Sequence, residues 1–356
     1  MTDERETRVG KRSIRLAVAW ATLLALMSAG MATATPSTDA RSEHQRIVEF
    51  WTHERVAQAV PRHFVLDPGR GFVPAAKPDN PGGGKPGGGG DGDGDSGLVT
   101  GASWTSGGAV VATTGKVLFQ MGGSFYVCSA SVVTDGSTAD ADSLILTAGH
   151  CAYDETNRAF ATNWLFIPDY DSAPAPLTAS GSFCADTEYG CWTAEALTVH
   201  TGYASAGGFN DTAVVHDFAV ATVYGGGHSR EAKLDGTVGT QDIAFTEIGL
   251  GNLVYAFGYP AAQKYKGNDL VYCAGPVGTD PNTGGATYRI ECGMTGGSSG
   301  GPWFSPFTEG SGTGTLASVN SYGYRGDSGM YGPKFNANTQ AVYTTADGAT
   351  ADTIVP

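Results

Sequence analysis

Short runs of β-forming residues follow one another between residues 99 and 356, and they restrict the possible fold more than any other feature. Gly, Asn, Asp and Pro separate the runs, many run residues are β-branched or aromatic, and several runs alternate as strands with one buried face do. A helical period is nearly absent apart from a short stretch near 336–340. We therefore expect an all-β fold, a sandwich or barrels. The expected strands are 116–120, 124–133, 143–148, 164–167, 192–199, 217–223, 253–258, 269–273, 287–292, 302–304, 315–322 and 341–345.

The first 34 residues have the pattern of a secretory signal peptide. A basic start at Lys11, Arg12 and Arg15 precedes an apolar stretch at 16–27 that is too short for a comfortable membrane span, and residues 32–34 (Ala-Thr-Ala) fit the small-x-small cleavage rule. We expect cleavage after Ala34. No later apolar stretch approaches about 18 residues, so the mature protein is expected to be secreted, extracellular and independent of the membrane.

Residues 35–98 differ in composition from the rest of the chain. Residues 41–60 carry apolar side chains among charged neighbours and predict an amphipathic helix that Pro61 ends. Residues 78–97 are a Pro/Gly tract, which is typical of a flexible linker that cannot build a core. A helix joined by a linker to residues 99–356 predicts a propeptide, a partner within the same chain; a disordered extension is the alternative.

The charge and cysteine content of residues 99–356 restrict partners and compartment. This region holds 9 Lys and Arg against 23 Asp and Glu, an excess of 14 negative charges, which argues against nucleic acid or an anionic membrane as a partner. An even number of cysteines behind a signal peptide indicates disulfides; 15 connectivities are open, and sequential pairing is the simplest. No CxxC or HExxH spacing indicates a metal site. All six cysteines lie here: Cys128, Cys151, Cys184, Cys191, Cys273 and Cys292.

A serine surrounded by glycines at 295–302 (Thr-Gly-Gly-Ser-Ser-Gly-Gly-Pro) is the strongest chemical signal. Glycine loses more conformational freedom on folding than any other residue, so such a run needs a reason. A tight turn that exposes the Ser299 hydroxyl and points backbone amides at a developing oxyanion supplies one. The amides of Gly297 and Ser299 are the candidates for that oxyanion hole.

A serine nucleophile needs a base and a group that orients the base. His150 ends an apolar run and precedes Cys151, which could anchor it, so it is the candidate base. The orienting carboxylate should be buried, and Asp217 stands beside the apolar residues Phe218 to Ala221. Asp211 is the second choice, whereas Asp154 is most simply a solvated loop charge.

These residues resemble the motifs of the chymotrypsin-like (trypsin-type) serine peptidases. Residues 147–151 (Thr-Ala-Gly-His-Cys) are similar to the family's T-A-[AG]-H-C, 217–220 to D-[IF]-A-[LV], and 297–302 to G-[DN]-S-G-G-P apart from Ser298. Residues 321–323 resemble the S-W-G segment, which pairs with bound peptide as an antiparallel strand. The chain order His, Asp, Ser is also that of this family.

The resemblance implies two six-stranded antiparallel β-barrels with the active site in the cleft between them. By it, His150 and Asp217 come from the first barrel and Ser299 from the second, Ser321, Tyr322 and Gly323 bind substrate, and Cys128–Cys151 is the bridge behind the histidine loop. Residues 50–56 (Phe-Trp-Thr-His-Glu-Arg-Val) also resemble a segment that precedes many actinobacterial secreted trypsin-like peptidases.

The sequence departs from the family pattern at two places. Ser298 replaces the Asp that pairs with a new N-terminus in the animal enzymes, so activation through that ion pair is not expected. Gly293 stands where the trypsin subgroup has a pocket Asp, and Asn320 where the glutamate-specific bacterial subgroup has a His. Met294, Thr295 and Asn320 are the expected pocket linings, and a neutral, apolar or small side chain is the expected preference.

The resulting hypothesis is a secreted, monomeric serine endopeptidase that acts on polypeptides through an acyl-enzyme and needs no cofactor and no metal. Two other classes remain open: a binding protein that keeps the fold without turnover, and an esterase using the same triad. Fold alone never establishes activity, but no member of the triad is missing from this sequence.

Overall fold

The computed structural model describes residues 38–67, 71–74, 97–136, 142–170, 183–261 and 264–356. The expected signal peptide, its cleavage site and most of the Pro/Gly tract lie outside these residues. The strands up to residue 223 are β1 Val60–Pro61, β2 Phe64–Asp67, β3 Gly71–Pro74, β4 Val99–Ser103, β5 Thr114–Met121, β6 Ser124–Val133, β7 Ser143–Thr147, β8 Tyr153–Asp154, β9 Ala159–Phe160, β10 Thr162–Pro168, β11 Trp192–His200 and β12 Ala219–Val223.

The later strands are β13 Asp242–Ile243, β14 Leu253–Gly258, β15 Val271–Pro276, β16 Gly278–Thr279, β17 Thr287–Glu291, β18 Pro302–Thr308, β19 Thr313–Val319, β20 Tyr322–Tyr324, β21 Gly329–Pro333 and β22 Thr353–Val355. The helices are α1 Thr38–Phe50, α2 His53–Gln58, α3 Ala109–Thr113, α4 Thr201–Ala204, α5 Asp211–Val215, α6 Leu234–Val238 and α7 Ala337–Ala346, with 3-10 turns η1 Gly149–Cys151, η3 Phe183–Asp186 and η4 Pro281–Thr283.

Six strands form a closed antiparallel barrel in the first half of the fold. The order is β5-β6-β7-β12-β11-β10, and β10 pairs back onto β5. The barrel closes because β6 is long: it pairs with β5 along most of its length, and its last residues pair also with β7. Fully buried side chains such as Val132, Leu146 and Val220 belong to the larger core.

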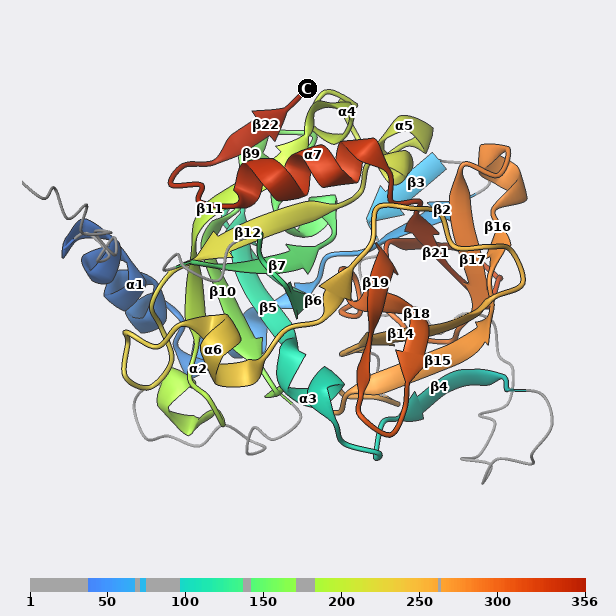
Figure 1. Ribbon diagram of the computed structural model, residues 1–356. Helices are drawn as coiled ribbons and strands as arrows, with labels where there is room; N and C mark the ends of the chain where they lie inside the picture. The colour runs from blue at the N-terminus through green and yellow to red at the C-terminus, as the bar shows by residue number, and fades with distance from the viewer. Residues whose placement is uncertain (1–37, 68–70, 75–96, 137–141, 171–182, 262–263) are drawn as a thin grey trace, which may run out of the picture. The chain divides into compact units, whose positions relative to one another are not determined.

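Six further strands surround a second core, which includes Val254, Ile290 and Trp303. β14 pairs with β15 and β18, β18 with β19, and β17 with β21. The disulfide Cys273–Cys292 joins β15 to the residue after β17, and the Ser318 hydroxyl on β19 donates to the Pro333 carbonyl oxygen beside it, at 2.7 Å. The two groups of strands are visible in Figure 1, and the two-barrel fold expected from the sequence is confirmed.

The helix expected over 41–60 is two helices in the structure. α1 ends at Phe50, and α2 begins after Thr52, whose hydroxyl accepts a hydrogen bond from the Arg55 amide. Trp51 lies at the break because its ring is buried and its Nε1 donates to the Asn163 carbonyl oxygen on β10, at 2.7 Å. Burial of this indole and the Thr52 cap outweigh continuation of the helix.

The strand expected at 341–345 is wrong, because those residues belong to helix α7. Asn336 begins the helix with a capping box: its side chain accepts from the Asn338 amide, and the Thr339 side chain accepts from the Asn336 amide. The β-branched and aromatic residues of this stretch favour strand only weakly, and the cap and packing against β11 and β12 decide the outcome. None of the helices in the described part of the chain has the length and apolar character needed to cross a bilayer.

Candidate active site

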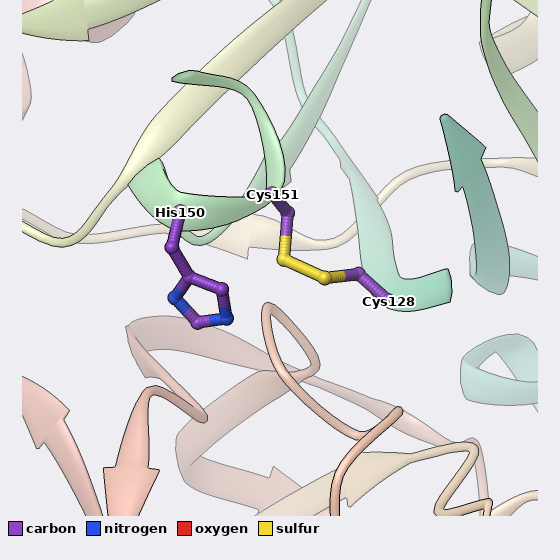
Figure 2. Close-up of side chains that lie close together, drawn as sticks. All are labelled: Cys128, His150 and Cys151. Atoms are coloured by element: carbon purple, nitrogen blue, oxygen red, sulfur yellow. A yellow bond between two sulfur atoms is a disulfide. The ribbon is translucent and has the colours of Figure 1, made fainter. Parts of the chain in front are cut away.

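His150 lies in the turn η1, directly after β7, and its neighbour Cys151 is bonded to Cys128 on β6. Figure 2 shows the imidazole and the disulfide extending from this same turn. These three residues form a group of potential metal ligands, but the two sulfur atoms are bonded to each other and offer no thiolate. The disulfide therefore fixes the turn to the barrel wall and fixes the position of the histidine backbone.

Asp217 lies just before β12 and holds His150 through one hydrogen bond to its backbone and one to its ring. The His150 backbone amide donates to Oδ1 at 2.8 Å, and Nδ1 of the ring lies 2.8 Å from Oδ2. Both side chains are 0 % exposed. A wholly buried carboxylate in contact with Nδ1 fixes the tautomer that leaves Nε2 as the proton acceptor.

The other carboxylates considered from the sequence lie elsewhere. Asp211 is exposed at the start of α5, and Asp154 accepts hydrogen bonds from Thr156 and Asn157 of its own loop. His216, next to Asp217 in sequence, stacks on His200 with ring centroids 4.6 Å apart. The structure therefore brings Asp217 to His150 and leaves Asp211 and Asp154 away from the ring.

Ser299 lies in a glycine turn that is packed directly against the histidine turn. Gly297 and Gly300 have φ values of +100° and +79°, which L side chains rarely adopt, and a Cβ on Gly300 would overlap Thr147 and Ser129. Ser129 on β6 joins the glycine turn to the end of β7. Its amide donates to the Ser299 carbonyl oxygen at 2.7 Å and its hydroxyl to that of Gly297 at 2.8 Å, while its own carbonyl oxygen accepts from the Thr147 hydroxyl at 2.9 Å.

The ring atom that would accept the serine proton is buried in this form. Among the described residues, His150 Nε2 has no hydrogen-bond partner, so the Ser299 hydroxyl does not bond it here. The ring is instead contacted edge-on by Phe64 and Phe209, with centroids 5.6 and 5.7 Å away. Phe64 is on β2, in the N-terminal segment that precedes the Pro/Gly tract. Neither aromatic residue was singled out from the sequence.

Asn320 does not line the specificity pocket as expected. Its side chain is wholly buried, Nδ2 donates to the carbonyl oxygens of Phe257 (2.8 Å) and Ser298 (3.0 Å), and Oδ1 accepts from Trp303 Nε1 at 2.6 Å. Both N–H donors of the amide are used by its own surroundings, and its buried Oδ1 already accepts one hydrogen bond, so the side chain is not presented to a substrate. Asn320 therefore braces the turn that carries Ser299.

A cavity of about 300 Å³ lies beside Ser299. The residues expected there from the sequence, apart from Asn320, line it: Met294, Thr295, Ser321, Tyr322 and Gly323. The sequence analysis did not place the other lining residues at this cavity. They are Cys292, Gly296, Ser298, Tyr324, Arg325, Gly326, Asp327, Gly329 and Met330 from the second barrel and His63, Phe64 and Val65 from residues 60–67. His63, Phe64 and Val65 are far in sequence from the motifs, whereas Cys292 and residues 324–330 lie close to motif residues but carry no chemical pattern that marks a cavity wall.

Tyr322 forms one side of this cavity and is fixed by a buried carboxylate. Its hydroxyl donates to Asp280 Oδ2 at 2.6 Å, and the Tyr324 hydroxyl donates to the same oxygen. Burial and the hydrogen bond to Asp280 raise the pKa of Tyr322, so the phenol stays protonated and keeps donating. The segment that resembles S-W-G is thus held in place from behind by Asp280.

The six cysteines are paired in the structure as Cys128–Cys151, Cys184–Cys191 and Cys273–Cys292. This is the sequential order given as the simplest pairing from the sequence. The first bridge lies behind the histidine turn and the third at the cavity wall, so two of the three hold parts of the candidate site.

Comparisons with solved structures identify the family. Protease Anisep from Arthrobacter nicotinovorans is 37% identical with a TM-score of 0.57, and the match covers 70% of this chain and 100% of that one. A thermostable serine protease, AL20, from an extremophilic microorganism is 35% identical with a TM-score of 0.55, covering 67% of this chain and 98% of that one. A Glu endopeptidase shares the fold at 19% identity, with a TM-score of 0.51, covering 72% of this chain and 99% of that one.

No family model matches the chain, and no curated protein matches it. The family assignment depends on the two structures that share more than a third of their residues with this chain over nearly their whole length. With the closed antiparallel barrel and the second group of strands described above, these matches show that the chain belongs to the chymotrypsin-like bacterial serine peptidases.

Proposed function

We propose that this chain is a serine endopeptidase that hydrolyses peptide bonds through an acyl-enzyme. The observation that carries the proposal is the buried pair of His150 and Asp217, 2.8 Å apart, in a turn packed against the turn of Ser299. A buried Asp–His pair next to a serine in a glycine turn is the arrangement that general-base activation of a hydroxyl requires.

In the proposed mechanism, Ser299 Oγ attacks the scissile carbonyl carbon while His150 Nε2 takes its proton. Asp217 holds Nδ1 and stabilises the imidazolium that forms. The oxyanion of the tetrahedral intermediate accepts from the amides of Gly297 and Ser299, and within the described residues neither amide donates to another backbone carbonyl. The imidazolium then protonates the leaving amine, and water repeats the sequence to release the acid.

The cavity supports a preference for a neutral or apolar side chain before the scissile bond. Met294, Met330 and the Cys273–Cys292 bridge contribute apolar surface to its wall. Its acidic lining residue, Asp327, is already bonded to Arg289 at 3.1 Å and to the Tyr331 hydroxyl. Mass-spectrometric mapping of cuts in a peptide library tests this preference, and cleavage after Lys, Arg or Glu alone would contradict it.

The remaining parts of the proposal concern processing and location. Residues 1–34 are proposed as a signal peptide and 35–98 as a propeptide, and the mature monomeric enzyme is proposed to act outside the cell. Three disulfides support an oxidising compartment. N-terminal sequencing of protein recovered from the culture medium tests both cleavage steps.

The catalytic role of Ser299 is tested with a fluorophosphonate probe, which bonds covalently to activated serines. The protein is labelled both as the full chain and after proteolysis has removed residues 35–98. We expect Ser299→Ala to abolish labelling and casein hydrolysis while thermal unfolding is unchanged. Ser311→Ala, on the exposed hairpin between β18 and β19, is the control and should label as the wild type does. Labelling that persists in Ser299→Ala would remove Ser299 from the role.

A further inference from the structure

The N-terminal segment, described at residues 60–67 and 71–74, passes over the candidate active site from one barrel to the other. β1 pairs in parallel with β6 of the first barrel, with Val60 opposite Tyr126. β2 then pairs in parallel with β20, with Phe64 opposite Tyr322, and β3 pairs with β2. In Figure 1 the blue strands β2 and β3 lie beside β21 in the second barrel. This segment therefore covers the site with main-chain ladders at both ends.

Arg62 fixes the segment to the histidine turn. Its guanidinium donates to the His150 carbonyl oxygen and forms an ion pair with Glu155 at 3.0 Å, and the Tyr203 hydroxyl donates to the same carboxylate oxygen at 2.9 Å. Arg62 and Glu155 are both buried. Burial disfavours the Arg62 charge, but Tyr203 and Glu155 outweigh it and raise the Arg62 pKa, so the guanidinium stays charged. Removing one partner of a buried ion pair is strongly destabilising, because the other charge is left buried without a partner.

Phe64 covers the His150 ring itself. It stacks on Phe209 with ring centroids 4.0 Å apart and meets the imidazole edge-on at 5.6 Å. Phe72, on β3, continues this cluster by contacting Phe209 and Tyr322 edge-on. With the segment in place, Ser299 is 4 % exposed and His150 is wholly buried. The segment therefore lies over His150 and lines the cavity beside Ser299.

The chain direction of β2 differs from the direction expected for a bound substrate. The family resemblance implies that a bound substrate pairs with residues 321–323 as an antiparallel strand, whereas β2 runs parallel to β20. A strand in the opposite direction reverses the order of its amides and carbonyls relative to Ser299. Its carbonyl groups are therefore not presented to the hydroxyl and the oxyanion amides as those of a substrate would be.

We infer that the cleft binds residues 60–67, with β3 (71–74) paired behind them, as a built-in peptide inhibitor that lies in the reverse of the substrate direction and is not cleaved. The site recognises an Arg-His-Phe peptide: Glu155 and the His150 carbonyl hold the arginine, Gly296 takes the histidine, and Phe209 takes the phenylalanine. A Cβ on residue 296 would overlap the His63 ring, so this contact requires glycine. The inference rests on the proposed function.

A second consequence concerns activation. β4 begins at Val99, after the linker, and α1 is held on the first barrel by the buried Ile47 and Trp51. Cutting the linker alone removes none of the contacts of α1, β1, β2 or β3. Nicked protein is therefore expected to remain inhibited until the segment itself leaves or is degraded.

The first experiment measures how fast the fluorophosphonate probe labels the unprocessed full chain. Phe64→Ala removes the ring over His150 and is expected to label at least about tenfold faster than the wild type. Val65→Pro, which disturbs the ladder with β20 without altering either barrel, should do the same if Phe64→Ala folds poorly. Glu54→Gln, exposed on α2, is the control and should label at the wild-type rate.

The second experiment maps the cuts that the chain makes in itself. The wild-type full chain and the Ser299→Ala full chain are incubated separately, and the fragments of each are identified by mass spectrometry. Residues 60–74 should stay in one piece while bound, with cuts confined to the linker or other exposed places. A cut within 60–67 that depends on Ser299 would show that the segment binds as a substrate and would overturn the inference.

The outcomes distinguish the inference from the proposed function. If wild type labels as fast as Phe64→Ala and Val65→Pro, the segment does not inhibit and the inference fails, while serine activity stands. If no form labels even after the segment has been removed, the proposed function fails and the inference fails with it. Slow labelling of wild type and of nicked protein, with fast labelling of the variants, supports the inference.

Discussion

The Ser321 hydroxyl donates a hydrogen bond to Asp217 Oδ2, the same oxygen that lies 2.8 Å from His150 Nδ1. Ser321 is on the second barrel, and the other two residues are on the first. The orientation of the candidate base therefore depends on both barrels, and a residue expected only to bind substrate also holds the orienting carboxylate.

Ser321→Ala should lower kcat roughly tenfold, the equivalent of about 1.4 kcal/mol, with little change in KM. The backbone that pairs with substrate is kept, while Asp217 loses a donor that fixes its position. Steady-state kinetics with a chromogenic peptide measure the effects on kcat and on KM separately. Ser318→Ala removes another buried hydroxyl, which bonds Pro333 away from the site, and should leave kcat unchanged. Equal losses in the two variants would mean that only stability is affected.

Asp217→Asn should lower kcat by about a thousandfold to ten-thousandfold, because an amide in contact with Nδ1 favours the wrong tautomer of His150. Asp211→Asn is the matched control, since Asp211 was the second choice from the sequence and is exposed on α5. Its kcat should equal that of wild type. A large loss in Asp211→Asn with a small loss in Asp217→Asn would reverse the assignment.

Asn320→Ala should destabilise the fold by about 3 kcal/mol, because Trp303 Nε1 loses its acceptor and the carbonyl oxygens of Phe257 and Ser298 each lose a donor in the buried interior. Urea unfolding followed by tryptophan fluorescence gives the free energy. Asn268→Ala, at an exposed position, should change it by no more than about 0.5 kcal/mol. If Asn320→Ala were as stable as the wild type and had an altered cleavage preference, Asn320 would be assigned to the substrate-binding pocket.

The sequence predicted most of the barrel strands, because turn residues and β-branched runs are local signals, and its motifs named residues that the structure brings close together, such as His150 and Asp217. β6 and β14 match the expected ranges at both ends. The strand expected at 341–345 is part of helix α7 instead, because the hydrogen bonds of the capping box at Asn336 start a helix that continues through these residues. The role of Asn320 and the contacts of Phe64 could not be predicted. Both depend on partners far away in the chain, Trp303 and Phe257 for the first and Phe209 and His150 for the second.

Lys116 is a buried amine on β5. Its Nζ donates to the Gly267 carbonyl oxygen at 2.5 Å and lies 3.8 Å from the centroid of the Tyr170 ring. Burial lowers the pKa of this lysine to about 7. The lysine pKa in an unfolded chain is about 10.4, so between the two values the unfolded chain binds a proton that the folded chain has released.

The free energy of unfolding should therefore rise with pH between 7 and about 9, with this group contributing up to about 1.4 kcal/mol per pH unit. The sign follows from linkage: stability rises with pH wherever the unfolded state holds more protons. Burial raises the pKa of Tyr170 to about 12, so its titration lies above this window. Urea unfolding of Ser299→Ala protein at pH 7, 8 and 9 avoids self-digestion. Adding Lys116→Met to that protein should flatten the dependence, and an equally steep slope in both would show that Lys116 stays charged in the fold.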